Sequence, residues 1–274
     1  MHAKKSLGQH FLRSKEALGQ IIEAAEIREG EVVLEIGPGE GALTEALLFA
    51  GAQVVAVEAD RRCTAMLEER FAESIRVGRL LLIAGDIREE KTQKELFKNK
   101  FLGNSSYKLV ANIPYYLTGM LFRLFLEPRN AGRQPSHLVF LVQKEVAEQI
   151  VARDGKESIF SLAVKVFGTP RYVAKVDRKA FTPSPKVDSA IVAVIDISRA
   201  RLGKLSPEKY FRVVKAGLGA KRKMLLGNLA HGLKIPKEKL AEIFQALGVD
   251  ERTRGEDVPA EKWVALAQEI KNVE

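Results

Sequence analysis

A glycine-rich segment after one apolar run and a carboxylate at the end of the next suggest a nucleotide-binding site in the first quarter of the chain. Gly37, Gly39 and Gly41 follow an apolar, β-branched run within EIGPGEG (35–41). Glycine permits a positive φ and lets the backbone approach a ligand closely. Glu58 ends the next apolar run, 21 residues after Gly37, where a carboxylate can accept hydrogen bonds from ribose hydroxyls. On these two features alone, the dinucleotide site of a nicotinamide-dependent oxidoreductase is an open alternative.

Three further features argue against a dinucleotide and favour an adenine-containing ligand. The glycines follow the order G-P-G-E-G instead of the G-x-G-x-x-G that presents a helix N-terminus to a pyrophosphate. Asp86 follows the third apolar run, where it can accept from the exocyclic amine of an adenine, although a lone Asp there is more often a turn or cap residue. The fourth run continues into Asn112-Ile113-Pro114-Tyr115, in which Pro114 fixes its own φ and restricts Ile113. This tetrad presents an amide rigidly beside an aromatic ring.

A sheet must position these residues, and the hydrophobic pattern predicts one. Short β-branched runs alternate with segments of helical period, which predicts βαβ units and a doubly wound, mostly parallel sheet that binds ligands at the carboxyl ends of its strands. The predicted strands are 32–36, 53–58, 80–86, 107–112, 137–143, 171–176 and 190–197. The predicted helices between them are 42–51, 60–73 and 118–127. Only the loop 177–189 joins the last two strands, so we expect an antiparallel pair at the end of the sheet.

The pattern of the chain changes after Ile197. Three segments, 206–230, 236–248 and 259–271, are predicted as helices with no strand candidate between them. We therefore expect a catalytic domain over residues 1–200, which includes an N-terminal arm over 1–16. A small all-helical domain follows over 201–274.

Composition restricts the class of protein. Of the 274 residues, 46% are hydrophobic, which excludes wholesale disorder. The one cysteine, Cys63, excludes a disulfide framework and a cysteine-based metal cage. No apolar run approaches the ~20 residues needed to cross a bilayer, and the N-terminus lacks the pattern of a secretory signal. We expect a cytoplasmic, monomeric protein that does not bind membranes.

The net charge of +9 is unevenly distributed along the chain. Residues 1–16 carry a net +3, residues 17–198 balance, residues 199–234 carry ten basic residues against one acid, and residues 235–274 carry a net −3. Such asymmetry is typical of a nucleic-acid-binding surface, although a solvated basic helix face would give the same count.

Six residues of the basic segment stand out by their spacing. Lys221, Arg222 and Lys223 are consecutive, and Lys209, Arg212 and Lys215 precede them at helical spacing. Contacts between such side chains and phosphates give affinity and orientation with little sequence choice.

Taken together, these motifs resemble the class I S-adenosylmethionine-dependent methyltransferases that act on an exocyclic amino nitrogen. More narrowly, the chain resembles the adenine N6-dimethyltransferases of small-subunit ribosomal RNA. The narrower resemblance rests on four further segments, KKSLGQHFL (4–12), QKEVAEQI (143–150), FTPSPKVDSAIV (181–192) and AKRKMLLGNL (220–229). The match is collinear over nearly all of the chain. It departs at His10, where many relatives have Asn, and at Ile113, where many have Leu.

The resemblance implies a Rossmann-like class I methyltransferase fold and S-adenosylmethionine as the cofactor. It places the methionine portion near Gly37 and Asn112, the ribose hydroxyls on Glu58, and the adenine near Asp86 and Ile87. It also implies that Gln9, His10 and Leu12 of the arm close over the cofactor.

Methyl transfer from a sulfonium is an in-line displacement that needs no metal, and its difficulty lies in the delocalised lone pair of adenine N6. We expect the Asn112 side-chain oxygen and the backbone carbonyl after it to accept hydrogen bonds from the amino group. Tyr115 offers one stacking face for a flipped base, and Phe181, in what we expect to be an exposed loop, offers the opposite wall. The sequence leaves two alternatives for Tyr116, which could pack in the core or line the site.

The resemblance implies a specific substrate, two adjacent adenines in the hairpin loop near the 3′ end of 16S rRNA, each methylated twice. The partner would be the small ribosomal subunit or its precursor, with Lys221, Arg222 and Lys223 binding RNA phosphates. Two alternatives stay open. The chain could be a ribosome-assembly factor that acts mainly by binding, or an adenine N6-methyltransferase of large-subunit rRNA.

Overall fold

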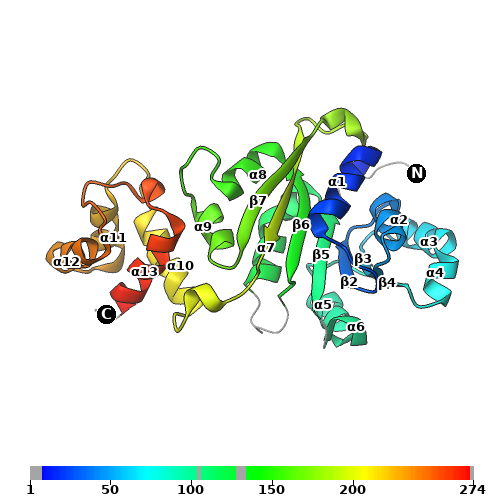
Figure 1. Ribbon diagram of the computed structural model, residues 1–274, viewed down its shortest axis with the longest axis horizontal. Helices are drawn as coiled ribbons and strands as arrows, with labels where there is room; N and C mark the ends of the chain where they lie inside the picture. The colour runs from blue at the N-terminus through cyan, green and yellow to red at the C-terminus, as the bar shows by residue number, and fades with distance from the viewer. Residues whose placement is uncertain (1–7, 104–105, 128–133, 272–274) are drawn as a thin grey trace. The chain divides into compact units, whose positions relative to one another are not determined.

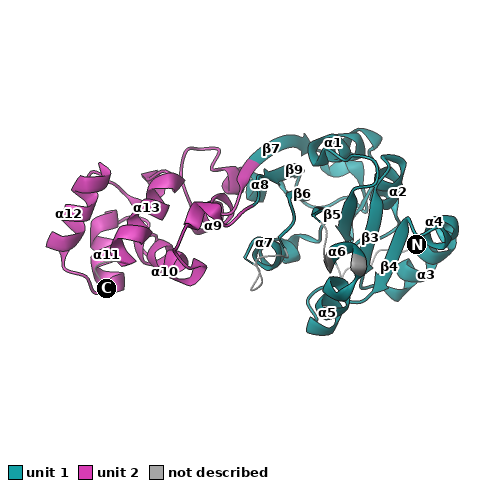
Figure 2. Ribbon diagram, turned by 60° about the horizontal axis from the view of Figure 1, so that its bottom comes forward, with its two compact units in different colours: residues 1–147, 171–197 teal, residues 148–170, 198–274 magenta. Residues whose placement is uncertain are grey.

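The computed structural model describes residues 8–103, 106–127 and 134–271. Lys4, Lys5 and the rest of residues 1–7, which belong to the predicted arm, lie outside the described residues. The chain divides into two compact units (Figure 2). The first consists of residues 1–147 and 171–197 and the second of residues 148–170 and 198–274, so the second also takes in a segment from within the predicted catalytic domain.

The first unit is built on a seven-stranded sheet with the order β4-β3-β2-β5-β6-β9-β7 (Figure 1). Strands β2 to β6 pair in parallel, and β9 runs antiparallel to β6. The strands are β2 (Val32–Ile36), β3 (Gln53–Glu58), β4 (Leu80–Ala84), β5 (Tyr107–Asn112), β6 (His137–Gln143), β7 (Thr169–Val176) and β9 (Ser189–Ile195). The predicted doubly wound, mostly parallel sheet is therefore confirmed, and its antiparallel strand, β9, lies toward the end of the sheet where antiparallel pairing was expected.

Helices cover both faces of this sheet. In chain order they are α1 (Lys15–Ala25), α2 (Ala42–Phe49), α3 (Arg61–Arg70), α4 (Ala72–Arg76), α5 (Glu90–Lys98), α6 (Lys100–Gly103), α7 (Thr118–Leu126) and α8 (Lys144–Val151), the last of which crosses the division between the units. The predicted helix 60–73 is thus two helices, α3 and α4, which meet at Phe71.

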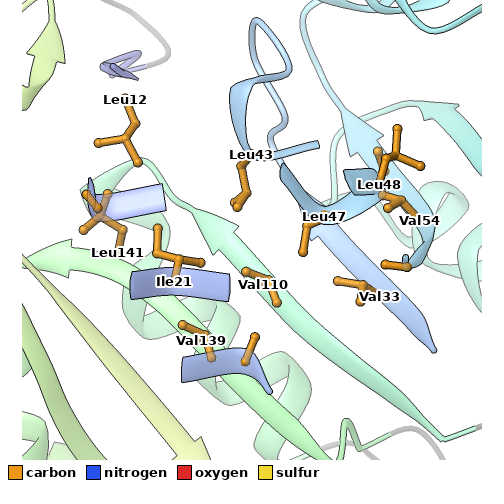
Figure 3. Close-up of a cluster of buried hydrophobic side chains, with 14 of the residues drawn as sticks. Leu12, Ile21, Val33, Leu43, Leu47, Leu48, Val54, Val110, Val139 and Leu141 are labelled. Carbon is orange, nitrogen blue, oxygen red and sulfur yellow. The ribbon is translucent and has the colours of Figure 1, made fainter. Parts of the chain in front are cut away.

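A single cluster of buried side chains joins α1 and α2 to one face of the sheet (Figure 3). Ile21 of α1 and Leu47 of α2 lie against Val33, Val110 and Val139, which point to the same face from β2, β5 and β6. Complete burial of one such side chain stabilises a fold by roughly 1.5–3 kcal/mol. This packing fixes the strands whose carboxyl ends carry the predicted site residues.

Aromatic rings pack on the other face. The Phe122 ring of α7 meets the Phe140 ring of β6 edge to face, with the centroids 5.2 Å apart. Phe97 of α5 lies against Phe125 of α7 at 6.4 Å. Such pairs contribute roughly 0.5–1.5 kcal/mol beyond the area they bury.

The N-terminal arm forms a strand of its own. β1 (Phe11–Leu12) pairs antiparallel with β8 (Phe181–Thr182), with Leu12 opposite Phe181. The Arg13 N–H extends this pairing by donating to the Ala180 carbonyl at 2.7 Å. Helix α1 then begins at once, because the Ser14 hydroxyl caps it by accepting from the Ala17 N–H at 3.2 Å. The arm is thereby fixed to a segment about 170 residues away in the chain.

The second unit is helical. Its main helices are α9 (Ile159–Lys165), α10 (Pro207–Gly217), α11 (Leu225–Leu233), α12 (Lys237–Leu247) and α13 (Ala260–Lys271). Trp263, Tyr210, Phe167 and Phe244 are its largest fully buried side chains. Within the described ranges, no helix has the length and apolar character to cross a bilayer.

The predicted single helix over 206–230 is wrong, because α10 and α11 are separated by an irregular segment, 218–224. The Asn228 amide of α11 donates to the Gly217 and Ala220 carbonyls, at 2.7 and 3.0 Å, and so satisfies groups that a continuous helix would bond internally. Gly217 lies where any Cβ would come within 2.5 Å of the Trp263 ring. Close packing at the end of α10 therefore turns the chain.

Candidate active site

An open cavity lies at the carboxyl ends of the parallel strands in the first unit. It is lined by residues 8–13, 35–40, 42–43, 57–59, 85–87 and 112–117 and by Phe181. All residues predicted to act in catalysis or to bind the cofactor are among them, namely His10, Leu12, Gly37, Glu58, Asp86, Ile87, Asn112, Tyr115 and Phe181. The predicted RNA-binding residues Lys221, Arg222 and Lys223 lie in the second unit, on the segment between α10 and α11.

The glycine turn after β2 opens the backbone to this cavity. Gly37 has φ +71°, and a Cβ built there meets no atom within 4 Å. Gly39, at φ +58°, lies so close to the arm that a Cβ would be 3.0 Å from the Phe11 ring. The first glycine therefore leaves room for a ligand, and the second lets the arm approach the turn.

Glu58 lies at the end of β3 and is 6% exposed. Its Oε2 accepts from the Gly39 N–H at 3.0 Å and its Oε1 from the Asp60 N–H at 2.8 Å. Burial raises the pKa of this carboxyl, while the two backbone donors oppose the rise. Each carboxylate oxygen can accept more than one hydrogen bond, so Glu58 can still accept from a ribose diol.

Glu35, near the end of β2, is a buried cavity residue that is not among those predicted from the sequence. It is 1% exposed, and its Oε2 accepts from the Thr44 hydroxyl at 2.7 Å. Burial raises the pKa of Glu35 to about 8, and the nearby Glu58 carboxylate adds to the rise. An acidic residue inside the apolar run VVLEI was the signal that could have identified it.

We expect the variant Glu35→Gln to gain stability over the wild type as the pH rises. In the wild type the unfolded chain ionises Glu35 near its ordinary pKa of 4.5 and the folded chain only near 8, so folding stability falls between these values. Glutamine keeps an acceptor for Thr44 and does not ionise. The difference between variant and wild type should grow by ~3 kcal/mol from pH 6 to pH 9 in urea unfolding, because one pKa unit is ~1.4 kcal/mol.

Glu45→Gln on α2 is the matched control, because the Glu45 side chain is 64% exposed. Its unfolding free energy should follow that of the wild type across the same pH range. A difference between Glu35→Gln and the wild type that does not change with pH would contradict the role of burial.

Asp86 and Arg88 form an ion pair where the chain leaves β4. The Arg88 Nε lies 3.0 and 2.9 Å from the two carboxylate oxygens of Asp86, and the Arg88 N–H also donates to Oδ1 at 2.9 Å. The guanidinium keeps the pKa of Asp86 below its ordinary value. Asp86 is therefore an ionised acceptor at the cavity, beside Ile87, which is 3% exposed.

The arm fixes the amide of Asn112. Its Nδ2 donates to the His10 carbonyl at 3.1 Å, which leaves Oδ1 as the group that the amide can offer as an acceptor. The His10 ring is in turn fixed on both sides. It stacks on Tyr115 with centroids 6.1 Å apart and an interplanar angle of 25°, and its Nδ1 bonds the Pro183 carbonyl at 2.8 Å.

Tyr115 is fixed by a residue distant in sequence. Its hydroxyl lies 2.8 Å from the Ser189 hydroxyl at the start of β9. Burial raises the pKa of Tyr115, so the phenol stays neutral at physiological pH. The segment 181–192 that carries the family resemblance contains Ser189, but nothing in the sequence paired it with Tyr115, which is 74 residues away. The bond sets the position of the ring beside Asn112.

The structure corrects the expectation for Phe181 and decides between the two alternatives for Tyr116. The expectation that Phe181 lies in an exposed loop is wrong, because it is 4% exposed, pairs with the arm in β8 and belongs to the buried cluster as well as lining the cavity. Tyr116 is 54% exposed and lines the cavity, so it is not a core residue.

Among the residues described, no three His, Cys, Asp or Glu side chains are grouped as they would be to hold a metal ion.

Comparison with known proteins identifies the family of the chain. The family described as ribosomal RNA adenine dimethylase matches residues 1–272. The ribosomal RNA small subunit methyltransferase A of Dehalococcoides mccartyi (strain CBDB1) is 40% identical over 270 residues, which are 98% of this chain and 89% of that protein. The protein of the same name from Thermosynechococcus vestitus is 37% identical, over 100% of this chain and 99% of its own.

Solved structures agree in fold over nearly the full length. A dimethyladenosine transferase from Plasmodium falciparum superposes with a TM-score of 0.76 at 25% identity, over 96% of this chain and 98% of its own. The 23S rRNA methyltransferase ErmE gives a TM-score of 0.73 at 25% identity, over 95% and 99%. The chain therefore belongs to the ribosomal RNA adenine dimethylase family and has its class I methyltransferase fold, as the motifs predicted.

Proposed function

We propose that this chain transfers methyl groups from S-adenosylmethionine to N6 of two adjacent adenines in the 3′-terminal hairpin loop of 16S rRNA, during biogenesis of the small ribosomal subunit. The observation that carries the proposal is the Asn112 amide, whose nitrogen is taken by the His10 carbonyl so that Oδ1 remains as an acceptor beside the Tyr115 ring. The names of the relatives in the small-subunit methyltransferase group support the substrate class.

The cavity residues fit a cofactor made of an adenine, a ribose and an amino acid. Glu58 ends β3 and Asp86 follows the neighbouring strand β4, so the cavity has two carboxylate acceptors suited to ribose hydroxyls and to an adenine amine. Ile87 adds an apolar contact for the adenine, and Gly37 leaves the backbone open for the methionine portion. When bound, S-adenosylmethionine supplies an electrophilic methyl group on a sulfonium.

The catalytic contribution of the chain is to position adenine N6 and to stabilise the charge that develops there. The Asn112 Oδ1 and the backbone carbonyl that follows accept hydrogen bonds from the amino group, which favours a tetrahedral nitrogen. Tyr115 and Phe181 hold the flipped base between them. The methylated nitrogen becomes acidic and loses its proton late, so no side chain is assigned as a general base.

RNA phosphates are bound by the basic part of the second unit. Lys221, Arg222 and Lys223 are exposed on the segment between α10 and α11. Lys209, Arg212 and Lys215 are exposed along α10, as the helical spacing predicts.

Arg201 illustrates that not every basic residue of this segment is available. Its guanidinium donates to the Gly168 carbonyl at 2.7 Å and to the Thr169 hydroxyl at 2.6 Å, and both residues belong to the second unit. Its charge is therefore engaged in holding the fold together.

The decisive experiment is to incubate the protein with radiolabelled S-adenosylmethionine and small subunits that lack the modification, and then to map the modified bases. We expect label on two adjacent adenines near the 3′ end of 16S rRNA. Large subunits serve as the control substrate, because the structurally similar ErmE is a 23S rRNA methyltransferase. Label in large subunits alone would identify a large-subunit target, and label in neither would refute the proposal.

A binding measurement separates this proposal from the dinucleotide alternative. S-adenosylhomocysteine and NADH are titrated separately against the protein by calorimetry. We expect micromolar-range binding of S-adenosylhomocysteine and none of NADH at the same concentrations. Preference for NADH would exclude a methyltransferase.

A further inference from the structure

An exposed arginine and an exposed tyrosine lie together at the rim of the cavity, outside the residues assigned above. Tyr116 is 54% exposed, one of the few large apolar side chains in the described parts of the chain with so much surface in solvent. The guanidinium carbon of Arg88 lies over its ring, 5.9 Å from the centroid. The Arg88 side chain is itself 51% exposed. An exposed aromatic face beside a binding cavity is a site where a ligand can stack.

Both side chains are held by other partners. Arg88 is fixed by Asp86, which accepts from its Nε and Nη2 and from its backbone N–H. On the tyrosine side, Gly8 of the arm lies so near that a Cβ there would be 3.5 Å from the Tyr116 ring. The two residues therefore form a preformed surface, the Arg88–Tyr116 platform, and a ligand would not have to order them.

The chemistry of the platform suits a nucleotide. A base can stack on the ring, and the guanidinium can donate to a phosphate oxygen. Asp86 engages Nε and Nη2, whereas Nη1 donates to no group in the described parts of the chain. The Nη1 edge of the guanidinium is thus available to an anion.

The adenosine part of the cofactor gives Arg88 no anion to bind. S-adenosylmethionine has no phosphate, its adenosine part is neutral, and its one carboxylate belongs to the methionine portion, which is assigned to Gly37 and not to the adenine position at Asp86. An RNA chain, in contrast, has one phosphate for each nucleotide, and single-stranded bases stack on exposed aromatic rings. The geometry thus favours RNA as the ligand of the platform.

We propose that Arg88 and Tyr116 bind the nucleotide next to the target adenine, with its base stacked on Tyr116 and the linking phosphate on Arg88. This inference rests on the proposed function, in which the neighbouring nucleotide is a second substrate adenine. The platform orders that nucleotide while the first adenine occupies the cavity. Because Asp86 offsets the charge of Arg88, we expect Arg88 mainly to orient the nucleotide. Its loss should therefore change the affinity for RNA only moderately.

The test uses the full chain with Arg88→Met, Tyr116→Ala and Tyr116→Phe. Affinity for a short RNA hairpin with two adjacent loop adenines is measured by fluorescence anisotropy at several salt concentrations, and affinity for S-adenosylhomocysteine by calorimetry. We expect Arg88→Met and Tyr116→Ala each to weaken hairpin binding at least fivefold. Arg88→Met should also reduce the slope of log K against log salt by about 0.7, the value for one phosphate contact on a single strand. Tyr116→Phe, which keeps the ring, should bind as the wild type does.

Arg76→Met is the matched control, because Arg76 is another exposed arginine in an ion pair with a nearby acid, Glu73, at 2.6 Å. It should leave the affinities for hairpin and cofactor product unchanged. Arg88→Met also removes the ion-pair partner of Asp86, whereas Tyr116→Ala leaves both charges of the Asp86–Arg88 pair in place. A loss of hairpin binding in Tyr116→Ala is therefore due to lost stacking and not to a change at Asp86.

Two results would overturn the inference. Weaker binding of S-adenosylhomocysteine with unchanged hairpin binding would assign the platform to the cofactor, and unchanged binding of both would show that it binds neither. Failure of the wild type to methylate small subunits would refute the proposed function instead, and the hairpin titrations would still decide whether the platform binds RNA.

Discussion

Replacing Asn112 by alanine should lower kcat for methyl transfer by ~10²–10³, the range seen when one group that stabilises developing charge is removed. The reason is geometric. Asn112 Nδ2 is engaged by the His10 carbonyl, so Oδ1 is the part of the amide that can stabilise N6 as it becomes positive. Alanine removes this acceptor and leaves the basic residues of the second unit untouched. The measurement is steady-state methyl transfer to small subunits, which gives kcat, together with binding of the subunit by sedimentation.

Asn112→Asp separates the two functions of the amide. Aspartate keeps an oxygen acceptor but cannot donate to the His10 carbonyl, so the arm loses this hydrogen bond to the end of β5. We expect a loss of rate smaller than that of Asn112→Ala and weaker binding of S-adenosylhomocysteine, because the arm lines the cavity. A variant Asn112→Ala that keeps kcat within tenfold of the wild type would refute the assigned role.

The same alanine variant addresses the alternative that the chain is mainly an assembly factor. If binding alone mattered, cells that carry only Asn112→Ala would assemble small subunits normally. A growth or assembly defect in those cells, with the variant protein still bound to the particle, would count against an assembly-only role.

The sheet could be predicted because its strands are defined locally. Val32–Ile36 and Gln53–Glu58 form with the predicted bounds, since both are apolar runs buried on two faces of the sheet. The positions of Glu58, Asp86 and Asn112 then follow, because the carboxyl ends of neighbouring parallel strands meet at one edge. Much of the candidate site was therefore accessible from pattern and strand order.

The errors arose where a partner distant in sequence decides the local structure. The polar residues after Phe181 suggested an exposed loop, but pairing with Leu12 of the arm buries that ring. The apolar period continues through 206–230, and the break depends on the Asn228 amide and the Trp263 ring, which no local pattern reveals. Likewise, the bond between Tyr115 and Ser189 joins two elements whose contact only the folded chain defines.

The second large effect concerns the basic segment that joins α10 to α11. Reversing Lys221, Arg222 and Lys223 to glutamate should weaken binding of the small subunit at least a hundredfold at low salt. Each phosphate contact contributes ~0.7–0.9 to the slope of log K against log salt, so loss of three should flatten it by about 2–3. All three side chains are exposed, and the turn beneath them is held by the Asn228 amide and by the backbone N–H of Lys223, which donates to the Ala220 carbonyl at 3.0 Å. Glutamate keeps this backbone bond, so the fold should persist.

The matched control reverses three other exposed lysines of the second unit, Lys237, Lys239 and Lys271, which lie in the part of the chain with a net charge of −3. Because both triple variants change the net charge by the same amount, a general electrostatic effect would weaken binding equally in the two. A specific phosphate-binding surface predicts a large loss for the first variant and a small one for the control. Binding of S-adenosylhomocysteine should match the wild type in both, since the cavity is lined by residues of the first unit. Equal losses in the two variants would mean that overall charge, and not the segment between α10 and α11, determines the affinity for RNA.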